Sequence, residues 1–326
     1  MWLFRSGSSR TAAAIPAAAS GNSPGSAANE NPEDIRHSRP RWNFEEGSLI
    51  APGRRSLKRL GGGSAYEVYL VWDEQLFALA VAKLLRPDRA TDPRALRELR
   101  READLLERLA HPALVRGFGS IPDGSHPHLL LEYAEGPTLH QLIDRHGPLP
   151  LEQLAPLALH VASVLQYLSS RRVVHLDVKP GNIVMGIPPR LIDLSIARDF
   201  DDAAQLRVPI GTDRYMGPEQ CDPTSSPAPV GPATDVWGFG ATLYHACTGT
   251  PPFVRDPDAT DGDILSRFPQ LIRDLPPLPK HIPSRFAEMI RRMLRKDPAG
   301  RPSLRDVVAS LEAIAPPERP RRRPAH

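Results

Sequence analysis

Cysteine is almost absent from this chain of 326 residues, and long apolar runs are missing. Its two cysteines, Cys221 and Cys247, cannot build a disulfide framework and lack the spacing of zinc ligands. The longest apolar stretch, 236–247, is interrupted by glycine, tyrosine and histidine, which excludes a membrane span. The first residues turn to Ser, Gly and Ala too early for a secretory signal. We therefore expect a cytoplasmic protein.

A large excess of charge of one sign is also missing. Lys and Arg together number 41 against 38 for Asp and Glu, and the resulting net charge of +3 does not indicate a nucleic-acid binder. Proline is abundant, with 37 residues, and glycine contributes 23, so we expect much loop or tail. The apolar fraction of 40% remains ordinary for a globular protein.

The two ends of the chain have compositions that do not support a packed core. Residues 1–53 are rich in Ser, Ala, Gly and Pro, and we expect them to form a disordered arm. Residues 315–326 alternate proline with arginine and indicate a solvated tail. Either end could dock a partner, although a charge run is more often simply solvated. The region between them, 54–314, shows no internal repeat and predicts one folded domain.

The first third of this domain has the pattern of strands. Short apolar or alternating runs at 57–60, 66–72 and 76–85 are separated by glycines and by a polar turn. Asp92 and Pro93 then predict the start of a helix, which ends before His111 and Pro112. Two further strands, near 115–120 and 128–133, would complete a small antiparallel sheet.

From about residue 136 the apolar spacing becomes helical. A long amphipathic helix is predicted around 154–168, and two more around 286–294 and 304–311. The run 236–247 is apolar on nearly every side and predicts a fully buried helix. We therefore expect an α+β protein with a sheet-rich lobe at about 54–135 and a helical lobe at about 136–314. The space between two such lobes is a usual place for a ligand.

Three glycines, Gly61, Gly62 and Gly63, lie between the first two predicted strands. Backbone amides without side chains could approach phosphate oxygens there. A flexible hairpin turn explains the same glycines equally well, because glycine clusters mark turns in many proteins.

A lysine follows inside an apolar strand. Lys83 lies in the run 80–85, where a buried cation needs an anionic partner. Glu102, on the inward part of the next helix, can supply that partner. The plain alternative is that both are surface charges, and their joint spacing disfavours it.

The segment 175–183 holds the largest concentration of polar groups next to apolar residues. Asp177, Lys179 and Asn182 follow an apolar pair, which places an acid, a base and an amide in one constrained loop. Asp193 stands at the end of another apolar run. Carboxylate and amide oxygens converging there would suit Mg²⁺. Each aspartate taken alone is more often a turn cap.

These motifs, taken in order, resemble the eukaryotic-type protein kinases, and especially the bacterial Ser/Thr kinases of that class. Later motifs extend the resemblance to residues 54–314: Gly217-Pro218-Glu219, Asp235-x-Trp237 and Arg301. The resemblance implies a bilobal kinase fold, with a small antiparallel sheet and one main helix preceding a larger helical lobe. It implies a non-specific Ser/Thr kinase that moves the ATP γ-phosphate to protein hydroxyls.

The resemblance also implies roles for the matched residues. Lys83, held by Glu102, would bind the α- and β-phosphates. Asp177 would orient the substrate hydroxyl, and Lys179 would offset charge on the transferred phosphoryl group. Magnesium, or manganese in its place, would be held by Asn182 and Asp193. The residues implied to contact ATP are Leu60, Gly61, Gly62, Gly63, Val68, Val81, Lys83, Leu131, Glu132, Ala134 and Val184.

Four other matched residues belong to the peptide-binding segment and its support. Thr212 is similar to the threonine that marks the Ser/Thr subtype. Glu219 and Arg301 resemble the ion pair that buttresses this segment, and Asp235 is implied to be structural as well.

Apart from a minor change at Gly217, four positions depart from the family pattern. Tyr66 replaces the third glycine and adds a bulky side chain over the phosphates or toward solvent. Val81 replaces a small alanine above the adenine, and Ser195 replaces the glycine after Asp193-Leu194. Leu176 replaces the arginine that normally receives a phosphate on the activation loop.

The acceptor of that phosphate is missing as well. Residues 196–211 contain no Ser, Thr or Tyr, so the two absences agree. We expect this segment to be ordered without phosphorylation, through contacts of Asp199, Asp201 or Asp202 with nearby arginines.

Two other functions stay open. The four departures would also suit a pseudokinase that binds nucleotide or a partner as a scaffold, although none removes a group at the metal or reacting phosphate. A small-molecule phosphotransferase of the related fold is disfavoured by Lys179, Thr212, Glu219 and Arg301.

Overall fold

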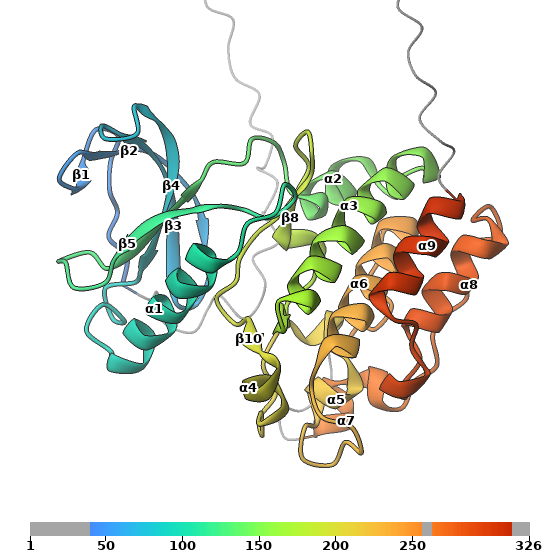
Figure 1. The fold of residues 1–326 in the computed structure, drawn as a ribbon. Coiled ribbons are helices and arrows are strands. Elements are labelled where there is room, and N and C mark those ends of the chain that lie inside the picture. Colours follow the sequence, from blue (N-terminus) through green and yellow to red (C-terminus); the bar gives the residue numbers. More distant parts are fainter. Residues whose placement is uncertain (1–39, 256–262, 315–326) are drawn as a thin grey trace, which may run out of the picture. The chain divides into compact units, whose positions relative to one another are not determined.

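Six antiparallel strands form a sheet at the start of the folded region (Figure 1). The computed structural model describes residues 40–255 and 263–314, all within one unit of the chain. The strands run in the order β1-β2-β3-β4-β6-β5. Their bounds are Leu49–Ala51 for β1, Arg54–Gly62 for β2, Tyr66–Asp73 for β3, Ala78–Leu85 for β4, Gly117–Ile121 for β5 and His128–Glu132 for β6.

Successive side chains of β3 and β4 point to opposite sides of the sheet, and both sides are covered by other parts of the chain. One side buries Tyr69, Val71, Ala80 and Ala82 in a small apolar cluster. The other side faces helix α1 (Pro93–Arg108) and joins the main core. The Asp92 carboxylate caps this helix by accepting the N–H of Arg94 at 2.9 Å, as the sequence predicts.

The folded region begins earlier than the sequence analysis predicts. Residues 40–53 fall in the expected disordered arm, yet they contain β1, and Trp42 and Phe44 pack against the sheet. The indole of Trp42 also donates a hydrogen bond of 2.7 Å to the Leu85 carbonyl. The prediction is therefore wrong for 40–53, because isolated aromatic residues show no periodicity. The remainder of the predicted arm, 1–39, and the predicted tail, 315–326, lie outside the described residues.

Helices make up most of the chain after the sheet (Figure 1). Residues 234–247 of α6 are all buried, which confirms the predicted all-round burial of this helix. Together with the sheet, the helices confirm the expected α+β fold. No helix within 40–255 or 263–314 is long and apolar enough to cross a membrane. The helices after the sheet have these bounds: Leu139–His146 for α2, Leu151–Ser170 for α3, Phe200–Ala204 for α4, Pro218–Cys221 for α5, Pro232–Thr248 for α6, Ile264–Arg267 for α7, Ser284–Met293 for α8 and Leu304–Ile314 for α9.

Two short antiparallel ladders position the polar loops of the helical part. Strand β7 (Val173–Val174) pairs with β10 (Arg198–Asp199), and β8 (Ile183–Val184) pairs with β9 (Arg190–Leu191). The Ile192 N–H donates a hydrogen bond of 2.9 Å to the Asn182 carbonyl just beyond the second ladder. The loop that ends at Asn182 therefore lies beside the loop that contains Asp193.

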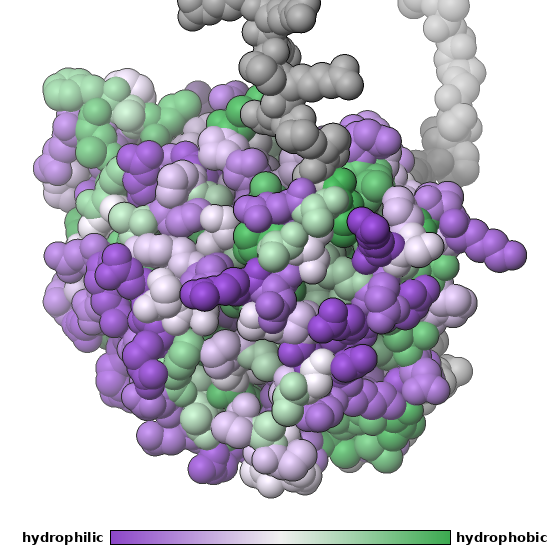
Figure 2. Space-filling view, turned by 45° about the vertical axis from the view of Figure 1, so that its right-hand side comes forward, coloured by the Kyte–Doolittle hydropathy of each residue, from purple (hydrophilic) through white to green (hydrophobic). Residues whose placement is uncertain are grey.

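Hydrophilic side chains cover most of the face in Figure 2. Several large apolar side chains are exposed around the β3–β4 turn, where Phe77 is 79% exposed. Trp72 and Leu79 face each other across the two strands just before this turn. They lie at the far end of the strands from Lys83.

Candidate active site

The Lys83 ammonium is held by two carboxylates. Its Nζ atom donates to Glu102 Oε1 and Oε2 at 2.8 and 2.9 Å, and to Asp193 Oδ1 at 2.7 Å. Lys83 comes from the C-terminal half of β4 and Glu102 from the buried stripe of α1, and both are almost fully buried. Because a buried charge is costly without a partner, this contact ties α1 to the sheet.

The electrostatics of this group keep Lys83 and Asp193 charged at neutral pH, whereas burial raises the pKa of Glu102. Burial lowers the pKa of Lys83, but the Asp193 and Glu102 carboxylates outweigh it and raise the pKa above its ordinary value. Burial likewise raises the pKa of Asp193, but the Lys83 ammonium lowers it more, and the net pKa lies well below the usual range. Asp193 also accepts the Ser195 N–H at 3.2 Å and has a left-handed backbone, with φ of 71°.

Asp177 lies at the centre of a second hydrogen-bonded group. Its Oδ1 accepts the Thr212 hydroxyl at 2.7 Å, and its Oδ2 lies 2.7 Å from Lys179 Nζ. Lys179 Nζ also donates to the Thr212 hydroxyl oxygen at 2.7 Å. Asn182 Nδ2 donates to Asp177 Oδ2 at 3.0 Å and to the Asp177 carbonyl at 2.9 Å. The structure thus brings an acid, an ammonium, a hydroxyl and an amide together.

The backbone of this loop is fixed from beneath by α6. The buried Asp235 carboxylate accepts the N–H groups of His175 and Leu176 at 2.7 and 2.9 Å. Leu176 has a left-handed backbone, with φ of 67°, and its carbonyl accepts the Gln220 amide at 2.8 Å. Gln220 also donates to the Ile210 carbonyl, so it joins the loop to the segment after it. Sequence reasoning missed Gln220, for which the one signal was its place beside Glu219.

The glycine turn folds back onto the start of β3. The Gly63 N–H donates to the Tyr66 carbonyl at 3.0 Å, and Arg86 Nε donates to the Gly63 carbonyl at 2.7 Å. A Cβ atom at Gly62, where φ is +156°, would lie 2.6 Å from the Tyr66 carbonyl oxygen. This position therefore requires glycine, and the turn is pinned on both sides.

Two of the side chains expected around adenine fall on adjoining strands. Val81 of β4 pairs with Leu131 of β6, and both Leu131 and Val184 are buried. Ala134 is partly buried just after β6. Leu60 differs, because its side chain is 42% exposed at the end of β2. Val81, Leu131, Ala134 and Val184 are thus buried or partly buried, whereas Leu60 is exposed.

The oxygen donors present fit a divalent metal bound together with phosphates. The Asp193 carboxylate and the Asn182 amide oxygen are the hard ligands that Mg²⁺ prefers, and the Ile192–Asn182 hydrogen bond sets their loops side by side. No cluster of three or more His, Cys, Asp or Glu side chains suited to a metal occurs in the described part of the chain. An ion at this place would therefore take further ligands from phosphate and water.

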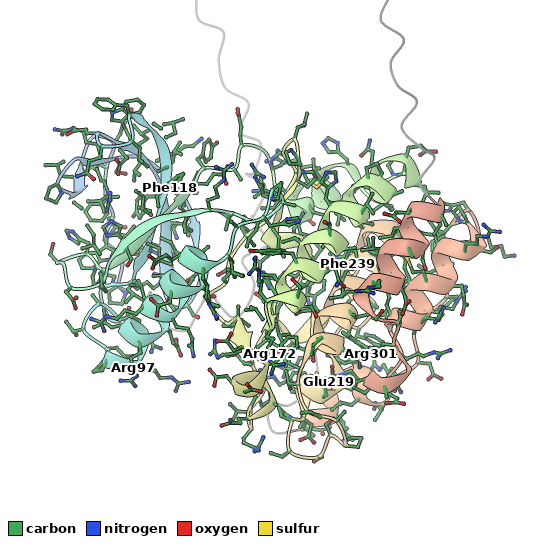
Figure 3. The ribbon with its side chains drawn as sticks, in the orientation of Figure 1. Arg97, Phe118, Arg172, Glu219, Phe239 and Arg301 are labelled. Atoms are coloured by element: carbon green, nitrogen blue, oxygen red, sulfur yellow. The ribbon has the colours of Figure 1, made fainter. Side chains whose placement is uncertain are left out.

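Glu219 and Arg301 form a buried bidentate ion pair (Figure 3). The two N–O distances are 2.7 and 2.8 Å, and Thr234 Oγ1 donates to the same carboxylate at 2.8 Å. The guanidinium also lies 4.9 Å from the Trp237 ring centre. These contacts join α5 and α6 to the segment just before α9.

Leu176 packs in an apolar cluster with residues that follow Asp193. Its neighbours include Ala203 of α4 and, partly buried, Phe200 and Leu206. Two exposed ion pairs lie beside this cluster: Arg108 with Asp199 at 2.6 Å and Arg172 with Asp201 at 3.1 Å. Figure 3 labels Arg172 near α4. Asp199 and Asp201 thus contact arginines in the way that the sequence analysis expects.

Comparison with known proteins places these features in one family. Residues 54–311 match the family described as protein kinase domain. The chain is 30% identical over 278 residues to serine/threonine-protein kinase PknB of Mycobacterium leprae, covering 80% of this chain and 43% of that protein. It is 32% identical to PkaA of Streptomyces coelicolor and to pkn2 of Myxococcus xanthus, covering 72% and 82% of this chain. The chain spans less than half the length of these relatives.

Proposed function

Because the chain belongs to the protein kinase domain family and is homologous to bacterial Ser/Thr kinases, we propose that it transfers the ATP γ-phosphate to Ser or Thr hydroxyls of proteins. The observation that carries this proposal is the simultaneous presence of two complete groups, Lys83 with Glu102 and Asp193, and Asp177 with its three partners. They include every group that the phosphoryl-transfer template requires.

The first group would bind the nucleotide phosphates. Lys83, fixed by Glu102, would contact the α- and β-phosphate oxygens. Asp193 and the Asn182 amide oxygen would hold Mg²⁺, or Mn²⁺ in its place. This ion supplies charge neutralisation at the β- and γ-phosphates when bound. Adenine would lie between Val81 and Val184, with hydrogen bonds to the backbone from Glu132 to Ala134.

The second group would place the acceptor hydroxyl. Asp177 would accept a hydrogen bond from the substrate Ser or Thr and orient its oxygen toward the phosphorus. Asn182 and the backbone bonds of Asp235 fix that carboxylate. Lys179 would offset the charge that develops on the transferred phosphoryl group. Positioning and electrostatics therefore supply most of the catalysis.

We further propose that activity does not require a phosphate between Asp193 and Glu219. The apolar cluster around Leu176 and the ion pairs of Asp199 and Asp201 support this, because they join the segment to the rest of the fold without a phosphate. A leucine in that cluster has no charge with which to receive a phosphate.

Transfer of radiolabelled γ-phosphate from Mg-ATP to a basic protein acceptor tests the main proposal. We expect label on Ser or Thr with the wild type, and no label when EDTA is present during the reaction, because EDTA removes the metal ion that the transfer needs. Asp177→Ala and Lys83→Met should each lower the rate by about 100-fold or more. Asp104→Ala and Lys58→Met, at exposed positions, serve as matched controls.

The outcome also separates the alternative functions. Nucleotide binding without transfer would favour the scaffold, and transfer only to small molecules would favour the related phosphotransferases. Peptide mapping by mass spectrometry after incubation with ATP tests the activation proposal. Activity that depends on a phosphate between Asp193 and Glu219 would contradict it.

A further inference from the structure

The side chain of Tyr66 points inward and covers the Lys83 ammonium. The distance from Lys83 Nζ to the centre of the Tyr66 ring is 4.6 Å. In the β3–β4 register Tyr66 lies opposite Leu85, and Val68 lies opposite Lys83, so these residues share one face of the sheet. The ring is partly buried and packs against the main core. Of the two directions left open by the sequence, solvent is therefore excluded.

The ring faces an ammonium whose donors are already used. Lys83 Nζ makes its three short contacts to two Glu102 oxygens and one Asp193 oxygen, and an ammonium carries three N–H groups. What remains is the attraction between the positive charge and the negative face of the ring. Burial raises the pKa of Tyr66 above its ordinary value, so the ring acts as a neutral phenol.

The backbone around Tyr66 fixes where the ring can lie. The Tyr66 carbonyl accepts the Gly63 N–H at 3.0 Å and leaves no room for a side chain at Gly62. Arg86 holds the opposite side of the turn through the Gly63 carbonyl. The ring is thus set in place by the same contacts that shape the glycine turn.

We propose that Tyr66 is a positioning residue that holds the Lys83 ammonium against Glu102 through a cation–π contact before nucleotide binds. A glycine here would leave that side of the ammonium open to water. With the ring in place, Lys83 and Glu102 stay paired, and α1 stays joined to the sheet without help from a bound nucleotide. This role depends on the proposed function in one respect: the lysine held in this way would then bind the phosphates of ATP.

Two other roles for the ring make different predictions. A ring that merely fills space could be replaced by another apolar side chain of similar size. A ring that obstructs the phosphates would weaken nucleotide binding, and its removal would tighten that binding. The proposed role requires an aromatic face and predicts weaker binding without it.

The first experiment measures the dissociation constant of Mg-ATP by calorimetry and the KM and kcat of transfer. Tyr66→Phe keeps the ring and should match the wild type within about twofold. Tyr66→Leu should weaken ATP binding between about 2-fold and 30-fold, the range that a cation–π contact gives. Trp72→Leu is the matched control, an aromatic on the same strand that does not contact Lys83. Tyr66→Leu with unchanged or tighter binding would overturn the proposal.

A second experiment separates the aromatic face from shape. Phenylalanine analogues with one, two and three ring fluorines, placed at position 66, weaken the negative face step by step and hardly change the volume. We expect the ATP dissociation constant to rise with each fluorine. A flat series would show that the ring acts by packing alone.

A third experiment needs no nucleotide, so it stands even if the protein does not transfer phosphate. The thermal unfolding midpoint is measured for the wild type, Tyr66→Leu, Lys83→Met and the double variant. If the ring acts on the ammonium, Tyr66→Leu should lower the midpoint much less in the Lys83→Met background. If the midpoint shifts of the two single variants simply add in the double variant, the proposal is overturned. If the shifts are not additive but the protein transfers no phosphate, only the proposed function is contradicted.

Discussion

The hydroxyl of Thr212 donates a hydrogen bond of 2.7 Å to the carboxylate of Asp177, across 35 positions of sequence. Lys179 contacts both partners, so three side chains close a small ring of hydrogen bonds. This ring joins the loop after β7 to the segment before α5. The proposed acceptor site and the proposed peptide-binding segment are therefore fixed to each other in the nucleotide-free protein.

Removing the Thr212 hydroxyl should slow transfer. Hydrogen bonds to charged groups contribute about 1.5–3 kcal/mol, so we expect Thr212→Ala to lower kcat by about 10-fold to 100-fold. Thr212→Ser keeps the hydroxyl and should retain most of the activity. Steady-state kinetics with a peptide acceptor measures the change, with the exposed Thr91→Ala as the control. Equal rates for Thr212→Ala and the wild type would contradict the role of this bond.

Truncating Leu176 should loosen the segment after Asp193. Leu176 is 3% exposed within its apolar cluster, and Leu→Ala changes in cores cost about 2–5 kcal/mol. We expect Leu176→Ala to lower the free energy of unfolding by an amount in that range, measured by urea denaturation. Leu176→Met should cost less than about 1.5 kcal/mol, because it conserves volume. Leu79→Ala, at a 42% exposed site, is the control and should change stability little.

Breaking the Glu219–Arg301 pair from one side should be strongly destabilising. Both side chains are at most 1% exposed, so Glu219→Ala would leave an uncompensated buried guanidinium. We expect a loss of about 3–5 kcal/mol in unfolding free energy by chemical denaturation. Glu219→Ala with Arg301→Ala should cost less than the sum of the two single changes. Glu288→Ala tests an exposed pair and should cost at most about 1 kcal/mol.

Stability should fall as the pH drops from about 6.5 to about 4. Burial lowers the pKa of His128 to about 4, and the nearby Arg54 also disfavours the protonated ring. Its Nδ1 contacts the His126 carbonyl at 2.6 Å and its Nε2 contacts Arg54 at 2.9 Å. Between the two pH values the unfolded chain binds a proton that the folded protein excludes, so acid favours unfolding. The slope from this group is about 1.4 kcal/mol per pH unit.

Urea denaturation at a series of pH values checks this prediction. His128→Gln should flatten the dependence between pH 4 and 6.5, because it removes one titrating group. Some slope should remain, since burial and the nearby His140 also lower the pKa of His245 to about 4. His146→Gln, at an exposed position, is the control. An unchanged slope in His128→Gln would show that this histidine is not the group responsible.

The main elements of the fold could be predicted because their signals are local. The Asp92 cap, the alternation of β3 and β4 and the apolar run of α6 each lie within one short stretch of sequence. The spacing of Lys83 and Glu102 indicated their contact for a similar reason, since a buried cation needs a buried anion.

Other features depend on contacts between distant stretches and left no local signal. Trp42 and Phe44 are isolated aromatics whose burial follows from the far side of the sheet. Gln220 joins two loops because folding brings the carbonyls of Leu176 and Ile210 within hydrogen-bond distance of its side-chain amide. The direction of Tyr66 was open until the strand register placed it on the face of Lys83.

The sequence by itself determined the fold class, the family and the identity of the proposed site residues, because motif order and apolar spacing are properties of the linear chain. The tertiary structure decided where the folded region begins, which side chain covers Lys83 and how Leu176 joins the segment after Asp193. The physical reason is that burial and ion pairing depend on groups brought close by folding, from positions that sequence spacing does not relate.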